Sequence, residues 1–295
     1  MDRMQRERSG DADEALGRGP SDEAGPAPIA VHRALALLAM AATLLVLAPD
    51  PASAQYFGRN KVQYDDFDFR VVETDHFRIH SYEGMSDQAV EDAARMAERW
   101  YDRLSRTFQH AFEEEVKKPL ILYANQPDFQ QTNAIPGFLS QATGGVTEGI
   151  KNRVIMPHAE TYGETDHVLG HELVHVFQYD LAGTYQGGGS TGFQRLPLWA
   201  VEGLAEYLTV GRTSSHTGAW MRDAVLRDDV PGIRDMSDSR EYFPYRYGHA
   251  LWAWIAGRFG DDTALTFYRR AARWGIPRAA QVVLGAPVDT LSRAW

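Results

Sequence analysis

The chain has 295 residues, enough for one large domain or two small ones with a real core, and its net charge is −10. This acidic balance, and the lack of a basic run with interleaved aromatic residues, argue against nucleic acid or an anionic lipid surface as a partner. The sequence has no cysteine and no glycine-rich phosphate loop, which excludes thiolate chemistry, disulfides and nucleotide binding of that type.

The first 54 residues predict a leader that is removed on export. Residues 1–30 are rich in Asp, Glu, Arg, Gly and Pro, so we expect a disordered extension. Residues 31–54 hold a fifteen-residue apolar run behind a positive flank and end in small residues, the pattern of a signal peptide cleaved after Ala54. The run is short for a membrane span, which needs about 20 residues, although an uncleaved anchor is the alternative. Thirty residues before a signal core are unusual, so we expect the true start near Val31. The signal peptide predicts an exported bacterial protein, periplasmic or extracellular, with no stable membrane span after cleavage.

The next part of the chain predicts a small sheet and one long helix. Alternating apolar and polar residues over 67–72 and 76–82 indicate two half-buried strands. An amphipathic helix is expected from Ser86, as its cap, to Phe112. Its apolar stripe consists of Val90, Ala93, Ala97, Trp100, Leu104 and Phe108. Further short strands are expected at residues 120–123, 143–149 and 153–157.

Residues 165–179 predict a helix that carries the pattern His-Glu-Leu-Val-His. Residues four apart lie on one face of a helix, so the imidazoles of His171 and His175 converge. Two neutral imidazoles held in this way are two arms of a tetrahedral Zn²⁺ site, and Glu172 beside them can take a proton from water. His167 shares this face, but we expect it to lie too far along the helix to reach the same ion. A helix with two half-exposed histidines is the alternative interpretation of the motif alone.

A second helix is predicted between Pro197 and Gly211, after a glycine-rich connection at residues 182–195 that either covers a cleft or is inert. Glu202 and Glu206 are four residues apart on one face of this helix, among apolar residues. A carboxylate in such a setting is costly unless it binds a cation or a hydrogen-bond donor. Zinc would supply the cation for Glu202, and a histidine N–H would supply the donor for Glu206. The two motifs together predict one zinc site built from the two histidines and Glu202.

The pattern His171-Glu172-x-x-His175 followed by Glu202-Gly-Leu-Ala-Glu206-Tyr resembles the gluzincin metallopeptidases, the clan of thermolysin and aminopeptidase N. Within that clan it is most similar to the bacterial peptidase MA-like domains, over residues 70 to 260. The longer histidine motif of the metzincins is absent. By this resemblance His171, His175 and Glu202 would be the zinc ligands and Glu172 the general base. Glu206 would be the acidic residue that orients a ligand histidine.

The resemblance also implies where substrate and transition state would bind. In relatives an edge strand before the zinc helix lines the cleft, and residues 144–149 are the candidate here. Glu148 matches only loosely the glutamate that grips the substrate amine in the aminopeptidases. Tyr245-x-x-Gly248 resembles the motif that carries their transition-state tyrosine. Thermolysin-type enzymes use a histidine, for which His249 is the candidate, and plain packing is the third alternative for both side chains.

The remaining sequence predicts a mostly helical lobe. Helices are expected at residues 220–227, 242–259, 262–275 and 277–284, and Asp289 is expected to cap another. We therefore predict an α+β fold, in which a small mixed β-sheet with a long helix precedes a mostly helical lobe and a zinc cleft lies between them. Residues 55–295 would form this metallopeptidase domain. Relatives are often followed by a TolB-like β-propeller, so the resemblance implies a truncated C-terminus and a missing propeller.

The expected activity is zinc-dependent hydrolysis of a peptide or protein substrate, with one Zn²⁺ and Glu172 as general base. Two alternatives are a zinc hydrolase of a non-peptide bond, as one relative opens an epoxide, and a non-catalytic zinc-bound envelope module. The complete set of ligands and base favours catalysis, because a degenerate site usually loses the glutamate first.

Overall fold

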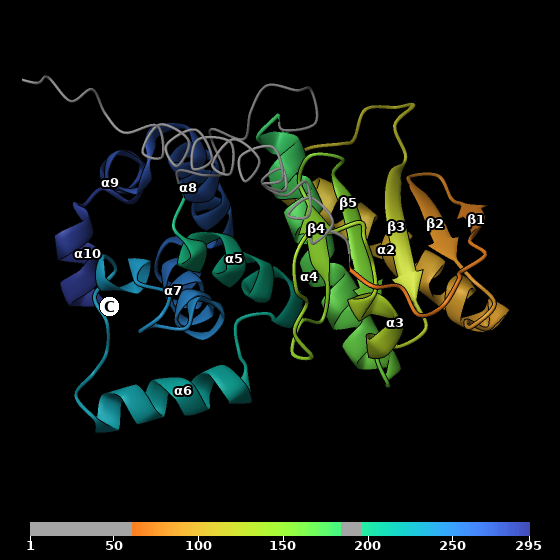
Figure 1. The fold of residues 1–295 in the computed structure, drawn as a ribbon. Helices are drawn as coiled ribbons and strands as arrows, with labels where there is room; N and C mark the ends of the chain where they lie inside the picture. Colours follow the sequence, from red (N-terminus) through yellow and green to blue (C-terminus); the bar gives the residue numbers. More distant parts are fainter. Residues whose placement is uncertain (1–60, 184–195) are drawn as a thin grey trace, which may run out of the picture. The chain divides into compact units, whose positions relative to one another are not determined.

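The computed structural model describes residues 61–183 and 196–295 (Figure 1). All described residues belong to one compact unit, which extends to Trp295. The predicted extension at residues 1–30, the signal peptide at 31–54 and most of the connection at 182–195 lie outside the described residues.

A five-stranded mixed sheet forms one layer, in the order β1-β2-β3-β5-β4. The strands are β1 (Arg70–Glu73), β2 (Phe77–Ser81), β3 (Lys118–Tyr123), β4 (Val146–Glu148) and β5 (Arg153–Pro157). The three central strands β2, β3 and β5 are parallel, and the two outer strands run antiparallel to their neighbours. All four residues of β1 are exposed, so the half-buried strand predicted at 67–72 is wrong in its burial, because β1 packs mainly against β2 and no described helix packs extensively on it. At the opposite edge of the described sheet lies β4, which falls within the predicted cleft strand.

Helix α2 (Asp87–Phe108) begins as predicted, with the Ser86 hydroxyl accepting a hydrogen bond from the backbone N–H of Ala89. It ends four residues earlier than Phe112 because Gln109 adopts the left-handed conformation, with φ 49°. The whole predicted apolar stripe is buried. The short helix α3 (Gln126–Gln130) was not predicted, and it begins at Asn125, whose side chain caps the N–H of Asp128.

Helix α4 (Tyr162–Leu181) packs against α2 (Figure 1). It begins three residues before the predicted segment because Thr161 is the cap and accepts from the N–H of Glu164. The helices approach closely at Gly170, where a Cβ atom would lie 2.4 Å from the Trp100 ring. The Trp100 indole N–H donates to Asp166 Oδ1 over 2.9 Å. This contact fixes the position of α4 relative to the long helix.

Helix α5 contacts both α4 and α7, and so joins the sheet layer to the helical part of the unit (Figure 1). The helices are α5 (Leu198–Val210), α6 (Ser215–Leu226), α7 (Pro244–Phe259), α8 (Asp261–Trp274), α9 (Ile276–Ala279) and α10 (Val288–Ala294), with a 3₁₀ turn η4 (Asp235–Ser237) and a π-helical turn η5 (Ala280–Leu284). Asp289 lies in the first turn of α10 and does not cap it, since Pro287 holds the cap position. None of the helices in the described ranges is long and apolar enough to span a bilayer. The α+β class with a small mixed sheet and a helical lobe is confirmed.

Candidate metal centre

Helix α4 carries several polar side chains into the interior. Every residue from Leu169 to Gln178 is buried, so this part of the helix has no solvent-facing side. His171, Glu172 and His175 are each less than one-tenth exposed. Buried polar groups cost free energy unless each finds a partner. The partners of these side chains therefore define the chemistry of the site.

The side chains of His171, His175 and Glu202 converge on one point. The two Nε2 atoms lie 3.2 Å apart, and Glu202 Oε2 lies 3.2 Å from His171 Nε2 and 3.1 Å from His175 Nε2. A tetrahedral ion bound at about 2.0–2.1 Å separates neighbouring ligand atoms by about 3.3 Å. The three atoms thus have the spacing of metal ligands, and the group can hold a metal ion. Helix α4 supplies both histidines and α5 supplies the carboxylate.

The electrostatics of this group favour a cation. Burial alone would lower the pKa of His171, but the carboxylates of Glu202 and Glu206 outweigh it and raise that pKa to about 10. Burial would also lower the pKa of His175, but the negative charge of Glu202 outweighs it and raises that pKa. Burial would raise the pKa of Glu202, but the two histidines hold it well below its ordinary value. The buried carboxylates therefore stabilise positive charge at this point, as protons or as a metal ion.

A charge count indicates the valence of that ion. Three carboxylates lie at the site, on Glu172, Glu202 and Glu206. The Arg246 guanidinium pairs with Glu206, its Nη1 lying 2.7 Å from Oε2. Among the described residues no other arginine or lysine forms an ion pair with these three carboxylates. With both imidazoles neutral, two negative charges are left over, which a divalent cation would neutralise.

Glu206 contacts His171 at Nδ1, the ring nitrogen that faces away from the converging group. Its Oε1 lies 3.2 Å from His171 Nδ1, a polar contact in which the N–H is not aligned for a hydrogen bond. His167 Nε2 lies 3.5 Å from the same oxygen. His167 is therefore in contact with Glu206 and is not one of the converging group, as predicted. A carboxylate on Nδ1 favours the tautomer that leaves Nε2 free to bind a metal.

Gln178, which is not among the residues predicted for the site, holds the other histidine. His175 Nδ1 donates to Gln178 Oε1 over 2.8 Å, and Gln178 Nε2 donates to the backbone oxygen of Val201 over 3.2 Å. This arrangement again directs the Nε2 lone pair toward the converging group. The local signal was present in the sequence, since a glutamine three residues after a histidine shares its helical face.

Glu172 is positioned by the edge strand β4. The Thr147 hydroxyl lies 2.7 Å from Glu172 Oε2 and 2.9 Å from the Glu172 backbone oxygen, and its single proton can be donated to either oxygen. Gly145 leaves room for the carboxylate, because a Cβ there would lie 2.9 Å from Glu172 Cγ. Neither residue was predicted to have this role. The region predicted to line the cleft therefore contacts the candidate general base directly.

Tyr245 lies against the metal-binding group from the side of α7. Its ring stacks on the His171 ring, with 5.6 Å between centroids and 17° between planes. Burial is the main cause that raises the pKa of Tyr245 far above its ordinary value, and the charge of Glu202 and a hydrogen bond with it add to the shift. The phenol therefore stays protonated and can donate a hydrogen bond at this site.

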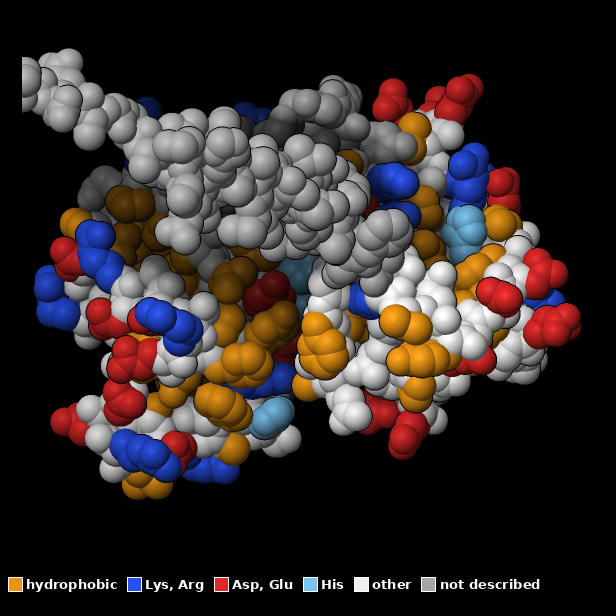
Figure 2. Space-filling model, in the orientation of Figure 1, with side chains coloured by type: hydrophobic (Ala, Val, Ile, Leu, Met, Phe, Trp, Pro, Cys, Tyr) orange, Lys and Arg blue, Asp and Glu red, His pale blue; other side chains and the backbone are white. Residues whose placement is uncertain are grey.

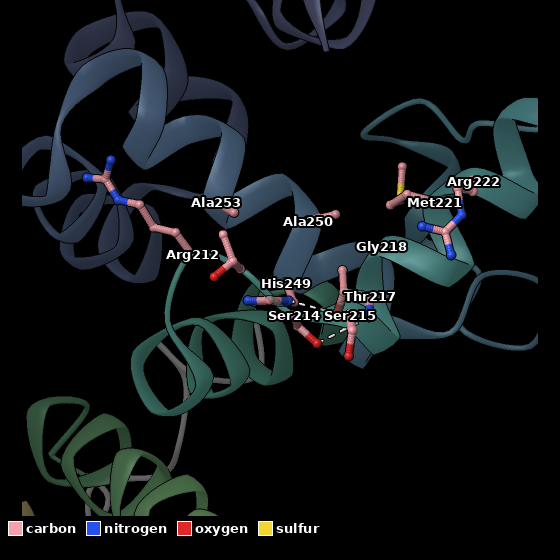
Figure 3. Close-up of a pocket in the computed structure, with 11 residues that line it drawn as sticks. Arg212, Ser214, Ser215, Thr217, Gly218, Met221, Arg222, His249, Ala250 and Ala253 are labelled. Carbon is pink, nitrogen blue, oxygen red and sulfur yellow. Dashed lines mark hydrogen bonds between the residues drawn. The ribbon is translucent and has the colours of Figure 1, made fainter.

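His249, the other candidate for stabilising the oxyanion, forms its hydrogen bonds elsewhere. Its Nδ1 lies 2.8 Å from Thr217 Oγ1, and its Nε2 lies 2.7 Å from the backbone oxygen of Gly211, to which it donates. His249 lines a separate cavity of about 550 Å³ between α6 and α7 (Figure 3). Both ring nitrogens are thus engaged away from the converging group.

Glu148, the loose match to an amine-binding glutamate, is engaged in the β4–β5 turn. Its carboxylate accepts hydrogen bonds from the backbone N–H groups of Ile150 and Lys151 and pairs with Arg153 Nε over 3.1 Å. These contacts occupy both carboxylate oxygens. Glu148 therefore stabilises the turn in this structure.

Comparison with models of protein families, with curated proteins and with solved structures found no match. The described residues thus form an α+β structure with a group that can hold a metal ion, built from the buried His171 and His175 and the partly buried Glu202.

Proposed function

We propose that the chain is an exported zinc-dependent metallopeptidase that hydrolyses peptide bonds. The observation that carries the proposal is the convergence of His171 Nε2, His175 Nε2 and Glu202 Oε2 within 3.2 Å of one another, beside the carboxylate of Glu172. Nitrogen and carboxylate donors suit Zn²⁺, and three protein ligands are typical of catalytic zinc sites, which keep one position for water or substrate. A structural zinc site would have four.

The roles of the residues follow from their positions. A zinc ion at this site would polarise the substrate carbonyl and make water a stronger nucleophile at neutral pH. Glu172, held by the Thr147 hydroxyl, accepts the proton of the attacking water and passes it to the leaving amine. Tyr245 keeps its proton and donates a hydrogen bond to the oxyanion that develops on the scissile carbonyl. Glu206 and Gln178 orient the two ligand histidines.

The edge strand β4 provides a surface for the substrate backbone. Among the described strands β4 pairs only with β5, so its other edge can accept an extended peptide as an additional strand. Thr147 of this strand touches Glu172. A peptide added to β4 would therefore run past the candidate general base.

The experiment is digestion of a peptide library by the zinc-loaded protein, by the same protein with a chelator, and by Glu172→Gln. We expect cleavage by the loaded protein, loss of cleavage with the chelator, and recovery when zinc is restored. Glu172→Gln should keep stoichiometric zinc and lose hydrolysis. Substantial turnover by Glu172→Gln, or cleavage that persists without metal, would refute the proposed mechanism. Zinc binding without any cleavage would instead support a non-catalytic zinc module.

A further inference from the structure

Four aromatic rings form a continuous row from the candidate metal centre to the surface. Tyr245 stacks on His171 at 5.6 Å between centroids, and Phe243 stacks on Tyr245 at 5.1 Å, with 28° between planes. Trp220 of α6 follows at 5.5 Å from Phe243 and is tilted by 34°. Each ring thus contacts the next, and the first belongs to a predicted metal ligand.

The outer two rings are exposed although they are held in place. Trp220 is 37% exposed and Phe243 is 41% exposed. The Trp220 indole N–H donates to His216 Nε2 over 3.3 Å, one turn earlier on the same helix. Phe243 directly precedes Pro244, which is the first residue of α7. Its backbone is extended, with φ −63° and ψ 112°, because a residue before proline avoids the α region. Neighbouring large apolar groups that are exposed and rigid mark recognition surfaces.

The surface around these two rings also carries exposed hydrophobic side chains (Figure 2). Figure 2 shows several hydrophobic side chains between α6 and a recess in which acidic and histidine side chains are visible. Deeper in the row, Tyr245 packs on His171 and is largely buried. The row therefore changes from a polar, metal-binding end to an exposed apolar end.

From this row we infer that Phe243 and Trp220 form the subsite for a large aromatic side chain of the substrate, an inference that rests on the proposed peptidase function. An extended peptide advances about 3.3 Å per residue, so Phe243 falls within about three residues, and Trp220 within about five, of a carbonyl bound beside His171. Exposed ring faces and edges favour another aromatic side chain over a small or charged one. The enzyme therefore prefers peptides with an aromatic residue within about three to five residues of the scissile bond.

The test compares two peptides that differ only in one residue near the cleaved bond, Phe or Ala. Wild-type protein should cleave the Phe peptide with a kcat/KM at least about tenfold higher, a preference of the size that one apolar contact supplies. Phe243→Ala should reduce this ratio to near one, and Trp220→Ala should reduce it in part. Phe243→Tyr keeps the ring and should restore the preference. Leu226→Ala, which removes an 85% exposed side chain from the same α6 helix, is the matched control and should leave the ratio unchanged.

Binding provides a readout without turnover. The zinc-loaded Glu172→Gln variant should bind the Phe peptide about tenfold more tightly than the Ala peptide in calorimetric titration, and adding Phe243→Ala to it should remove the difference. A wild-type protein that cleaves both peptides equally, or a Phe243→Ala variant that keeps the preference, would overturn the subsite while the peptidase proposal stands. If wild type cleaves no peptide of any sequence, the proposed function fails first and the subsite fails with it.

Discussion

Gly203 of α5 and Gly248 of α7 cross in direct backbone contact. A Cβ atom at Gly203 would lie 2.4 Å from the carbonyl carbon of Gly248, and one at Gly248 would lie 2.4 Å from the backbone oxygen of Trp199. Only glycines permit this approach. The crossing brings Tyr245 and Arg246, three and two residues earlier on α7, against the site, where Tyr245 contacts His171 and Arg246 pairs with Glu206 of α5.

Alanine at either glycine should therefore disturb the site as well as the fold. We expect Gly203→Ala and Gly248→Ala each to lower the free energy of unfolding by about 1–3 kcal/mol, because backbone atoms cannot move aside as a flexible side chain can. Zinc affinity should fall with it. Gly257→Ala is the matched control, since it lies in α7 with open space around it and should be neutral or stabilising by up to about 1 kcal/mol. Denaturant midpoints and zinc titrations of the three variants check this; equal behaviour would contradict it.

The Arg246–Glu206 ion pair should be strongly coupled. Both side chains are largely buried, with 16% and 4% exposure, so removal of Arg246 leaves a buried carboxylate with less compensation. We expect Arg246→Met to cost about 3–5 kcal/mol of unfolding free energy. Glu206→Gln in the same chain should reduce that cost, and a double-mutant cycle measures the coupling. Additive effects of the two changes would show that the pair is not coupled.

Gln178 should control metal affinity through His175. Gln178→Leu removes the acceptor for His175 Nδ1–H, and zinc affinity should fall about 10- to 100-fold. Gln178→Glu keeps that acceptor and removes the donor to the Val201 oxygen. It should therefore retain more affinity than the leucine variant. Competition with a chromogenic chelator ranks the three proteins, and a ranking in which both variants lose the same affinity would contradict the role given to Nδ1.

Thr147 should affect turnover and not metal binding, since it touches Glu172 and none of the three converging atoms. Thr147→Val keeps the shape of the side chain and removes the hydroxyl, so we expect kcat to fall about tenfold with zinc stoichiometry unchanged. Thr147→Ser keeps the hydroxyl and should restore most of the activity. Steady-state kinetics beside elemental analysis separate the two effects, and zinc loss in Thr147→Val would point to a structural role.

Acid should destabilise the protein partly through Glu98 of α2. Burial alone would raise the pKa of Glu98, but hydrogen bonds from Thr74 and His76 outweigh it and lower the pKa. A lowered pKa in the folded state means that this contribution is present above about pH 4.5 and is lost as the pH falls through the folded value. Glu98→Gln should therefore cost about 1 kcal/mol at pH 7 and less below pH 4. Melting curves across this range test it, with Glu91→Gln on the exposed face of α2 as control.

The sequence was sufficient to predict those features of the fold and site that depend on local periodicity. The four-residue spacing of His171 and His175, and of Glu202 and Glu206, places each pair on one face of its helix, and the structure brings His171, His175 and Glu202 together as expected. The Ser86 cap and the apolar stripe of α2 rest on the same kind of pattern. The α+β class followed from the order of such segments.

The rest of the site depends on tertiary placement. Arg246 lies 40 residues from Glu206, and Thr147 lies 25 residues from Glu172, so no local pattern connects them. Which of Tyr245 and His249 lies beside His171 also depends on the direction of the α7 face, which the Gly203–Gly248 crossing sets. The exposure of β1 follows from its place at the sheet edge, which alternation alone does not give.

Zinc-edge X-ray absorption spectroscopy of the protein loaded with one equivalent of Zn²⁺ tests the central claim most directly, with Glu202→Ala and His171→Ala beside the wild type. We predict one zinc per chain, two imidazoles and oxygen donors at about 2.0–2.2 Å in the wild type, and loss or marked change of that coordination in both variants. A wild-type spectrum without imidazole scattering, or one that both variants share, would contradict the claim that these side chains hold the metal.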